Sequence, residues 1–419
     1  MPELSESHVV TCFLRNKGEV LLLRRSDEVG SYSGKWGAVS GYAEGDPDSA
    51  ALREIEEETG LKDAVALVRR GEPFTVEDES LDKKWVVHPY LFDCNRRGVN
   101  VNWETTQADW VPPTEILKRR TVPDLWKSYE RIGPTVDSIR NDNEHGSAYI
   151  SVRALEVLRD KAGVLANKRQ VNGDTWDELK KTAKELLEAR PAMSALTNRV
   201  NRAMYRSKKI DSIDEKIHEE IRNAVKADEK AAERASRVIP GKRVLTLSRS
   251  GTVHGSITKA SPNPEVVVAE SRPAQEGVKV AEELSSEGVE VTLITDAAIP
   301  YALSHLDVEA VIVGADTVLP DGSVVNKTGT KSTGLASEHE GIPMYVVAAK
   351  DKISTETHPS LEEGDPSDVY DGDEELNIEN PKFDVTPPEF ITRVVTEDAE
   401  LRTSDIGEIV EELRNYANW

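Results

Sequence analysis

The stretch REIEEETG, residues 53–60, places four glutamates within eight residues. Glu54, Glu57 and Glu58 stand at positions i, i+3 and i+4, so a helix puts their carboxylates on one face. Three carboxylates on one face repel one another unless a cation lies among them. Hard divalent ions such as Mg²⁺ favour such oxygen clusters and bridge them to substrate phosphates. The spacing leaves two interpretations open, a metal site or a solvated acidic face.

The flanking residues predict where this helix begins and ends. Asp46 suits the N-cap position, Pro47 suits the first turn, and Gly60 suits the end. Arg53, at the start of the cluster, is placed to pair with one carboxylate and orient it. The helix therefore spans the region between Asp46 and Gly60 and carries the glutamates in its second half.

The overall composition makes the solvated-face interpretation a serious alternative. The chain has 419 residues, with 76 acidic against 53 basic side chains and a formal net charge of -23. This charge does not favour nucleic-acid binding, which needs basic surfaces. Together with an aromatic content of only 5%, it resembles the composition of proteins from salt-in halophiles, such as haloarchaea.

Length and apolar patterning bound the class of protein. The chain is too long for one ordinary core, so we expect two or three domains. No apolar run approaches the roughly 20 residues of a membrane span, and the first residues lack the order of a signal peptide. Two cysteines, Cys12 and Cys94, give neither a disulfide framework nor a set of metal ligands. We expect a reduced, cytoplasmic protein without a membrane partner.

Three kinds of patterning follow one another along the chain. Residues 1–125 indicate strands, with HVVTCFLR and GEVLLLRRS around a turn at residues 16–18, KWVVHPYLFDC further on, and a helix after the Pro-Pro pair in WVPPTEILKR. Residues 126–240 carry apolar positions at helical spacing. Residues 241–419 alternate short apolar runs with helix-length stretches, which predicts an α/β domain with a doubly wound parallel sheet.

A second group of candidate residues lies in the predicted parallel sheet. RVLTLSRSGTVHGS, residues 243–256, places Ser250 and Gly251 in a turn between strand and helix, where backbone N–H groups could bind a phosphate. Tight turns need small residues in any case, so this signal is weak alone. Asp316 follows a strand, at the edge where ligands bind in these folds. Asn326 and Lys327 suit a sugar phosphate, and Arg190 could add a phosphate clamp.

The first group of motifs resembles the Nudix hydrolase family. REIEEETGL matches the second half of the family signature, GKWGAVSGYAEGD is similar to its approach loop, and WETTQADWV is similar to a later loop containing an acid. The resemblance covers roughly residues 5–125 and implies an α/β/α sandwich. It implies that Glu57 and Glu58 hold Mg²⁺ or Mn²⁺, that Glu54 is a further ligand or the catalytic base, and that Glu104 is the late acid. Arg53 then belongs to the substrate site.

The implied reaction is attack of water on a diphosphate that is linked to another moiety. The sequence also departs from the family signature. Only eleven residues separate Gly41 from Arg53, which is fewer than usual, and Ser40 stands where a glycine is common. The question that follows is whether the shortened SGYAEGD loop still completes the site.

Residues from about 130 to 415 resemble the initiation factor 2B regulatory subunits and their sugar-phosphate isomerase relatives. The matching stretches are AESRPAQEG, which contains Arg272, VIVGADTVLPDGSVVNKTGT, FDVTPPEFITRVVTE and ARPAMSALTNRVNRAM. The resemblance implies a helical subdomain followed by a Rossmann-like domain, and a homodimer through this part. It implies substrate contacts from Arg272 and catalytic roles for Asp316 and for Ser248, which stands at the place of the isomerases' cysteine.

Three functional hypotheses remain open at this point. The first is a Nudix hydrolase fused to a domain that binds a phosphorylated metabolite. The second is a sugar-phosphate isomerase, of the ribose-1,5-bisphosphate type, with an accessory Nudix domain. The third is a non-enzymatic regulator related to translation initiation. Because a serine is a much poorer acid than a thiol, Ser248 argues against the second.

Overall fold

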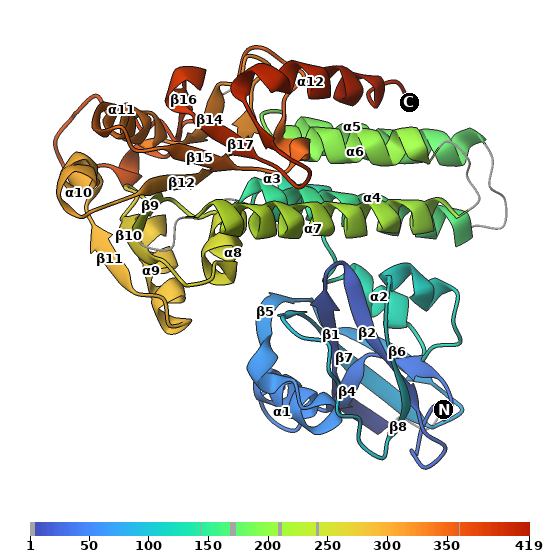
Figure 1. The fold of residues 1–419 in the computed structure, drawn as a ribbon. Coiled ribbons are helices and arrows are strands. Elements are labelled where there is room, and N and C mark those ends of the chain that lie inside the picture. Colours follow the sequence, from blue (N-terminus) through green and yellow to red (C-terminus); the bar gives the residue numbers. More distant parts are fainter. Residues whose placement is uncertain (1–4, 143, 168–172, 208–211, 240–242, 360) are drawn as a thin grey trace. The chain divides into compact units, whose positions relative to one another are not determined.

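The computed structural model describes residues 5–142, 144–167, 173–207, 212–239, 243–359 and 361–419 (Figure 1). Contacts divide the chain into two compact units. The first comprises Met1–Thr135, Glu156–Thr182 and Lys209–Arg222, and the second comprises Val136–Leu155, Ala183–Lys208 and Asn223–Trp419. Within the described ranges, every helix is too short or too polar to cross a membrane.

The described part of the first unit contains an eight-stranded sheet. Its main path runs β3-β2-β1-β7-β5, while β4 pairs with β1, β6 with β7, and β8 with β2. The β1–β2 pair is antiparallel and confirms the predicted hairpin around residues 16–18. The strand predicted in KWVVHPYLFDC is β7, which is parallel to β1. The strands are β1 Ser5–Asn16, β2 Glu19–Arg25, β3 Trp36–Gly37, β4 Val39–Tyr42, β5 Val65–Arg70, β6 Phe74–Asp78, β7 Lys83–Cys94 and β8 Thr105–Val111.

Helix α1, Pro47–Thr59, has the ends that the sequence predicts. The carboxylate of Asp46 accepts a hydrogen bond from the backbone N–H of Ser49 at 3.1 Å and so caps the helix. Gly60 adopts a left-handed conformation with φ 64° at the other end. Ile55 is fully buried in the core cluster between the helix and the sheet, which fixes the rotation of α1 about its axis.

The predicted helical region consists of long helices, and short helices precede them. The helix expected after the Pro-Pro pair is a 3-10 helix, η2.

In the second unit, Arg199 of α6 is fully buried and forms ion pairs of 3.0 Å with Asp228 of α7 and with Asp351. These pairs hold α6 and α7 against the loop that follows β15. The helices are η1 Lys62–Ala64, η2 Pro113–Leu117, α2 Leu125–Glu130, α3 Val136–Arg140, α4 Ser147–Asn167, α5 Gly173–Ala189, α6 Ser194–Arg206 and α7 Ile213–Val238.

The second unit contains a seven-stranded sheet in the order β11-β10-β9-β12-β15-β17-β18. Neighbouring strands pair in parallel except β17 and β18. The strand order reverses direction between β9 and β12, which makes this the topological switch point of a doubly wound sheet. The strands are β9 Arg243–Leu247, β10 Glu265–Ala269, β11 Val291–Ile294, β12 Ala310–Gly314, β15 Met344–Val347, β17 Arg393–Val395 and β18 Glu400–Leu401.

The remaining elements follow in chain order. They are α8 Gly251–Lys259, α9 Glu276–Ser286, η3 Asp296–Ala298, α10 Ile299–His305, β13 Thr317–Val318, β14 Val324–Lys327, α11 Thr330–Glu340, η4 Lys350–Lys352, η5 Pro366–Asp368, β16 Phe383–Thr386, η6 Pro388–Phe390, η7 Thr403–Asp405 and α12 Ile406–Asn415. Strands β13, β14 and β16 form a small antiparallel sheet, which sets Lys327 opposite Phe383.

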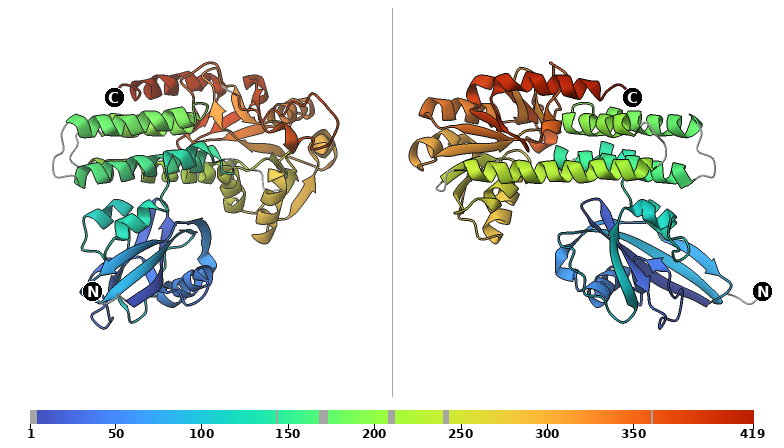
Figure 2. Two further views of the ribbon diagram at one scale, coloured as in Figure 1. Left: turned by 180° about the vertical axis from the view of Figure 1, so that it is seen from behind. Right: turned by 45° about the vertical axis from the view of Figure 1, so that its right-hand side comes forward.

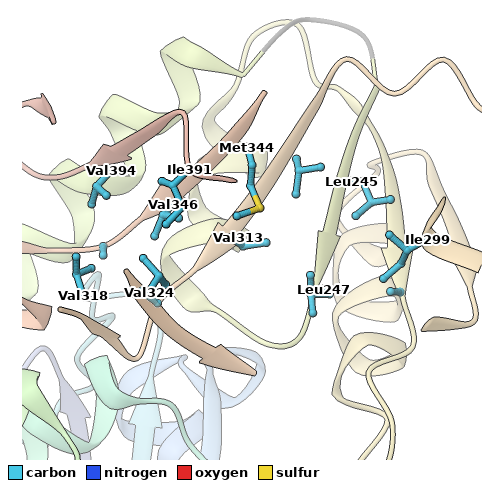
Figure 3. Packing of buried hydrophobic residues seen from close by; sticks show 14 of the residues in the cluster. Leu245, Leu247, Ile299, Val313, Val318, Val324, Met344, Val346, Ile391 and Val394 are labelled. Carbon is cyan, nitrogen blue, oxygen red and sulfur yellow. The ribbon is translucent and has the colours of Figure 1, made fainter. Parts of the chain in front are cut away.

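Helices cover both faces of the parallel sheet (Figures 1 and 2). Leu245 and Val313 belong to the core cluster on the side of α10 and α12 (Figure 3). Val244 and Ile312, their neighbours along the strands, belong to the cluster with α7, α8 and α9. Successive strand residues point to opposite faces, so strands buried on both sides appear as continuous apolar runs in the sequence. The predicted doubly wound α/β architecture is confirmed.

Candidate active sites

A pocket of about 690 Å³ lies in the first unit beside helix α1. Glu54 and Glu57 from α1 line it, and Glu104, which precedes β8, lines it as well. The fold therefore brings three of the four predicted metal-binding glutamates to one cavity, although Glu104 is about 50 residues from the other two in sequence.

Glu58, the fourth of these glutamates, is only 6% exposed. Its Oε1 accepts a hydrogen bond from the backbone N–H of Ser40 at 2.9 Å. Burial raises the pKa of Glu58 to about 8, and the nearby carboxylates of Glu104 and Glu54 act in the same direction. Burial also raises the pKa of Glu54, and the negative charges of Glu57 and Glu104 raise it further. A divalent cation bound among these carboxylates would relieve this repulsion.

The shortened loop before α1 contacts this glutamate cluster. The carboxyl group of Glu54 occupies the space that a Cβ atom on Gly41 would need, so a larger residue there would have to displace this carboxylate. Nη2 of Arg53 donates hydrogen bonds of 2.9 Å to the carbonyl oxygen of Tyr42 and to Oε1 of Glu54. Despite its length, the loop contacts Glu58 through Ser40 and Glu54 through Gly41, and Arg53 of α1 links Glu54 to Tyr42.

The donor set suits Mg²⁺ or Mn²⁺ because each candidate ligand is a carboxylate. Among the residues that the structure describes, no three acidic, histidine or cysteine side chains converge as a complete metal cage. The chemistry of the residues fits the ion, and Mg²⁺ commonly takes only one or two protein carboxylates together with waters and substrate phosphates.

The other walls of the pocket carry aromatic and cationic side chains. Tyr42 and Trp103 line it and are 52% and 62% exposed, and Trp85 lies with its ring centroid 6.0 Å from that of Tyr42. Arg25 and Lys83 also line the pocket. Exposed rings can stack on a nucleobase, and the cations favour a phosphate-containing ligand.

A second candidate site lies at the switch point of the parallel sheet. Ser248 directly follows β9 and has φ 61°, a left-handed conformation that is uncommon outside glycine. Its backbone N–H donates a hydrogen bond to Oγ of Ser271 at 2.7 Å. Its hydroxyl donates a hydrogen bond to Oε2 of Glu276, the first residue of α9, at 2.8 Å.

The carboxylate of Glu276 also forms an ion pair with Lys327, one of the residues predicted to bind a sugar phosphate. Nζ of Lys327 lies 2.9 Å from Oε1 of Glu276. Asp316, which follows β12, is close enough to interact electrostatically with Glu276 and Lys327. Burial raises the pKa of Asp316, while the ammonium groups of Lys352 and Lys327 oppose this effect. The predicted residues Ser248, Asp316 and Lys327 thus come together at the carboxyl ends of different strands.

Three further predicted residues lie around this site. Ser250 caps α8 by accepting a hydrogen bond from the backbone N–H of Val253 at 3.4 Å, and Gly251 is the first residue of that helix. The side chain of Arg272 is exposed, while its backbone N–H donates to Oδ2 of Asp296 at 2.7 Å. Contacts of these residues with a phosphate stay predictions.

Asn326 and Arg190 have partners inside the protein. The amide of Asn326 donates to Oγ1 of Thr330 at 3.0 Å. The guanidinium of Arg190 donates to the carbonyl oxygen of Ile139 at 3.0 Å and to that of Asp142. A phosphate would have to compete with these bonds.

Two residues of the second site were missed in the sequence. Glu276 stands in the quoted stretch AESRPAQEG, but a single glutamate in an acidic chain gives no spacing signal. Lys352 is 5% exposed and donates to the carbonyl oxygen of Ala315 at 2.6 Å. It is separated from Asp316 by 36 residues, so only the fold shows that they interact.

Comparisons with known proteins identify two families in two successive regions of the chain. Residues 6–132 match the NUDIX domain, and residues 143–400 match the initiation factor 2 subunit family. The ribose 1,5-bisphosphate isomerase of Archaeoglobus fulgidus is 32% identical over 289 residues, which cover 64% of this chain and 88% of that protein. A putative translation initiation factor eIF-2B subunit 2-like protein of Pyrococcus horikoshii is 32% identical over 275 residues, covering 58% and 95%.

The fold is similar to a solved structure of the same family. The crystal structure of the translation initiation factor eIF-2B of Pyrococcus horikoshii OT3 superposes with a TM-score of 0.56 at 26% identity, and covers 64% of this chain and 95% of that one. Both resemblances inferred from the motifs are therefore confirmed. The chain belongs to the initiation factor 2 subunit family and carries a NUDIX domain over residues 6–132.

Proposed function

We propose that the Nudix domain hydrolyses a nucleoside-diphosphate-linked compound with the help of Mg²⁺ or Mn²⁺, and that the second unit binds a sugar or nucleotide phosphate. The observation that carries the first part is the placement of Glu54, Glu57 and Glu104 around one pocket of about 690 Å³.

The residues of the pocket divide the chemistry among them. A bound divalent cation supplies charge neutralisation on the diphosphate. Glu54, whose pKa is raised by burial, is placed to accept a proton from the attacking water. Arg53 holds the Glu54 carboxylate in position through its 2.9 Å bond. Arg25 and Lys83 attract the anionic substrate, and Trp103 offers a ring to its base.

A phosphate-release screen tests the hydrolase. It covers nucleoside di- and triphosphates, nucleotide sugars and dinucleotides, in high salt, with and without Mg²⁺. We expect metal-dependent turnover that Glu57→Gln lowers by about two orders of magnitude. Glu56→Gln is the matched control, because Glu56 is exposed on the same helix and does not line the pocket. Absence of any turnover that depends on Glu57 would rule the hydrolase out.

A second candidate function, isomerisation of a sugar phosphate, is favoured by a specific geometry. Ser248, Glu276 and Lys327 are joined by bonds of 2.8 and 2.9 Å beside Asp316, at the switch point where doubly wound sheets bind ligands. The similarity to ribose 1,5-bisphosphate isomerases supports the same substrate class. A purely regulatory domain would bind such sugar phosphates without converting them.

A further inference from the structure

The carboxylate of Glu276 is the centre of the hydrogen-bond network in the second site. One oxygen accepts the Ser248 hydroxyl at 2.8 Å, and the other faces Nζ of Lys327 at 2.9 Å. The side chains of Glu276 and Lys327 are 28% and 20% exposed. The pair is therefore largely enclosed by protein and still accessible to a small ligand.

The backbone fixes where Glu276 lies. Gln275 before it has φ 54°, and the N–H of Gly277 after it donates to the carbonyl oxygen of Glu270 at 3.1 Å. A Cβ atom on Gly277 would collide with the carbonyl oxygen of Ala269. The first turn of α9 is thus pressed against the end of β10, so the carboxylate stands on rigid secondary structure, as a catalytic group requires.

The hydrogen bond also shows which group is suited to accept a proton. A serine hydroxyl is inert unless a neighbouring base takes its proton. Here Ser248 donates to one oxygen of Glu276, and the ammonium of Lys327 lies 2.9 Å from the other. The Glu276 carboxylate is therefore a better proton acceptor than the Ser248 hydroxyl, and the hydrogen bond from Ser248 holds this carboxylate in place.

We propose that Glu276 is the proton-transfer group of an aldose–ketose isomerisation of a pentose 1-phosphate at this site, with Ser248 and Lys327 as positioning residues. The proposal rests on the second candidate function and assigns it a carboxylate where the resemblance implied a cysteine. Asp316, which interacts electrostatically with both Glu276 and Lys327, is the second acid–base group and begins the reaction protonated.

The steps balance without a co-reactant. Asp316 gives its proton to the ring oxygen O4 as the C1–O4 bond breaks, and the electron pair of that bond stays on O4. Glu276 takes the proton from C2, and the C2–H electron pair forms a C1–C2 double bond. The proton on Glu276 exchanges with solvent, and Glu276 then delivers a proton to C1, while Asp316 takes the proton of the C2 hydroxyl. The product is the 2-ketose 1-phosphate, and both carboxyl groups regain their starting states.

Isomerisation assays on the full chain test this assignment. The probes are ribose 1,5-bisphosphate and 5-methylthioribose 1-phosphate, incubated without nucleotide or Mg²⁺, so hydrolase activity does not enter the result. Nuclear magnetic resonance in D₂O follows the ketose and its deuterium at C1. Calorimetry measures binding of the same probes, and circular dichroism checks folding.

We expect Glu276→Gln to lower kcat by about 10²- to 10⁴-fold with little change in binding. Glu276→Asp should recover part of this loss, and Ser248→Ala should lower kcat by only about tenfold. Glu282→Gln, an exposed position on the same helix, should match the wild type. Product from the wild type should carry deuterium at C1.

Other results would overturn the proposal. Isomerisation by Glu276→Gln within threefold of the wild type would exclude Glu276. A loss in Ser248→Ala as large as in Glu276→Gln would assign the transfer to the serine. Complete retention of the C2 hydrogen at C1 would indicate a hydride shift. If the sugar phosphates bind the wild type but are not converted, the second unit is a binding domain and not an isomerase.

Discussion

The carboxyl group of Glu54 lies against the α-carbon of Gly41, in the space that any side chain at position 41 would fill. This contact joins the loop before α1 to the acidic face of the helix. The short loop therefore retains the glycine on which Glu54 packs.

We predict that Gly41→Ala displaces the Glu54 carboxylate and lowers metal-dependent hydrolysis by about two orders of magnitude. The thermal midpoint should change little, because the clash involves the end of a partly exposed side chain. Gly98→Ala is the control, since a Cβ there meets no atom within 4 Å. Unchanged kcat/KM in Gly41→Ala would contradict the role of this contact.

Trp103 should determine affinity for the base of the hydrolysed compound. Its ring is 62% exposed and lines the pocket. Trp103→Ala should raise KM about tenfold and leave kcat nearly unchanged, because stacking contributes roughly 1–3 kcal/mol per base. Trp103→Phe should restore most of the affinity. Steady-state kinetics on the substrate found in the screen decides between these outcomes.

Lys327 should determine affinity for sugar phosphates in the second unit. Its ammonium, 2.9 Å from Glu276, is placed to turn toward an incoming phosphate. Lys327→Met should weaken binding of ribose 1,5-bisphosphate at least tenfold in calorimetry, since charge-assisted bonds are among the strong ones. Lys279→Met, at an exposed position on α9, provides the comparison. Equal affinities of the two variants would place the phosphate elsewhere.

Asp351 should make the stability of the second unit sensitive to acid. Burial opposes its ionisation, but Arg202 and Arg199 lower the pKa of Asp351 to about 2. Because the pKa in the unfolded chain is about 3.9, ionised Asp351 stabilises the fold above that pH by about 2–3 kcal/mol. This contribution is lost as the pH falls from about 4 toward 2.

Denaturant unfolding at several pH values tests the effect of Asp351. At pH 7 Asp351→Asn should lose about 3–5 kcal/mol, because it removes the carboxylate shared by the buried Arg199 and the partly buried Arg202. The difference from the wild type should shrink below pH 4. Asp398→Asn should change little, since its side chain is 59% exposed and its ion pair with Lys350 is open to solvent. A gap that stays constant with pH would refute the ionic explanation.

Local patterning made much of the fold predictable from the sequence. The caps at Asp46 and Gly60 fixed α1, and the turn at residues 16–18 fixed the first hairpin, because both depend on residues close in the chain. Strands such as RVLTL were recognisable because burial on both faces requires a continuous apolar run. The helix after the Pro-Pro pair is only a 3-10 turn, η2, since its five residues contain Pro113 and end in a loop.

The candidate sites were predictable only in part. Motif spacing located Glu54, Glu57 and Glu58, because residues three and four apart share a helix face. Asn326 and Arg190 looked like ligand groups by residue type, but the fold gives them internal partners in Thr330 and in backbone carbonyls. Residue type alone does not show which donors are already satisfied.

By itself, the sequence determined the two domain families, the helix that carries the glutamates, and the strand alternation of the second unit, because each is encoded over a few neighbouring residues. Only the tertiary structure decided that Glu104 shares a pocket with α1, that Gly41 packs on Glu54, and that Glu276 links Ser248 to Lys327. These relationships join residues from separate elements, and they exist only once strand order and helix packing have brought those elements together.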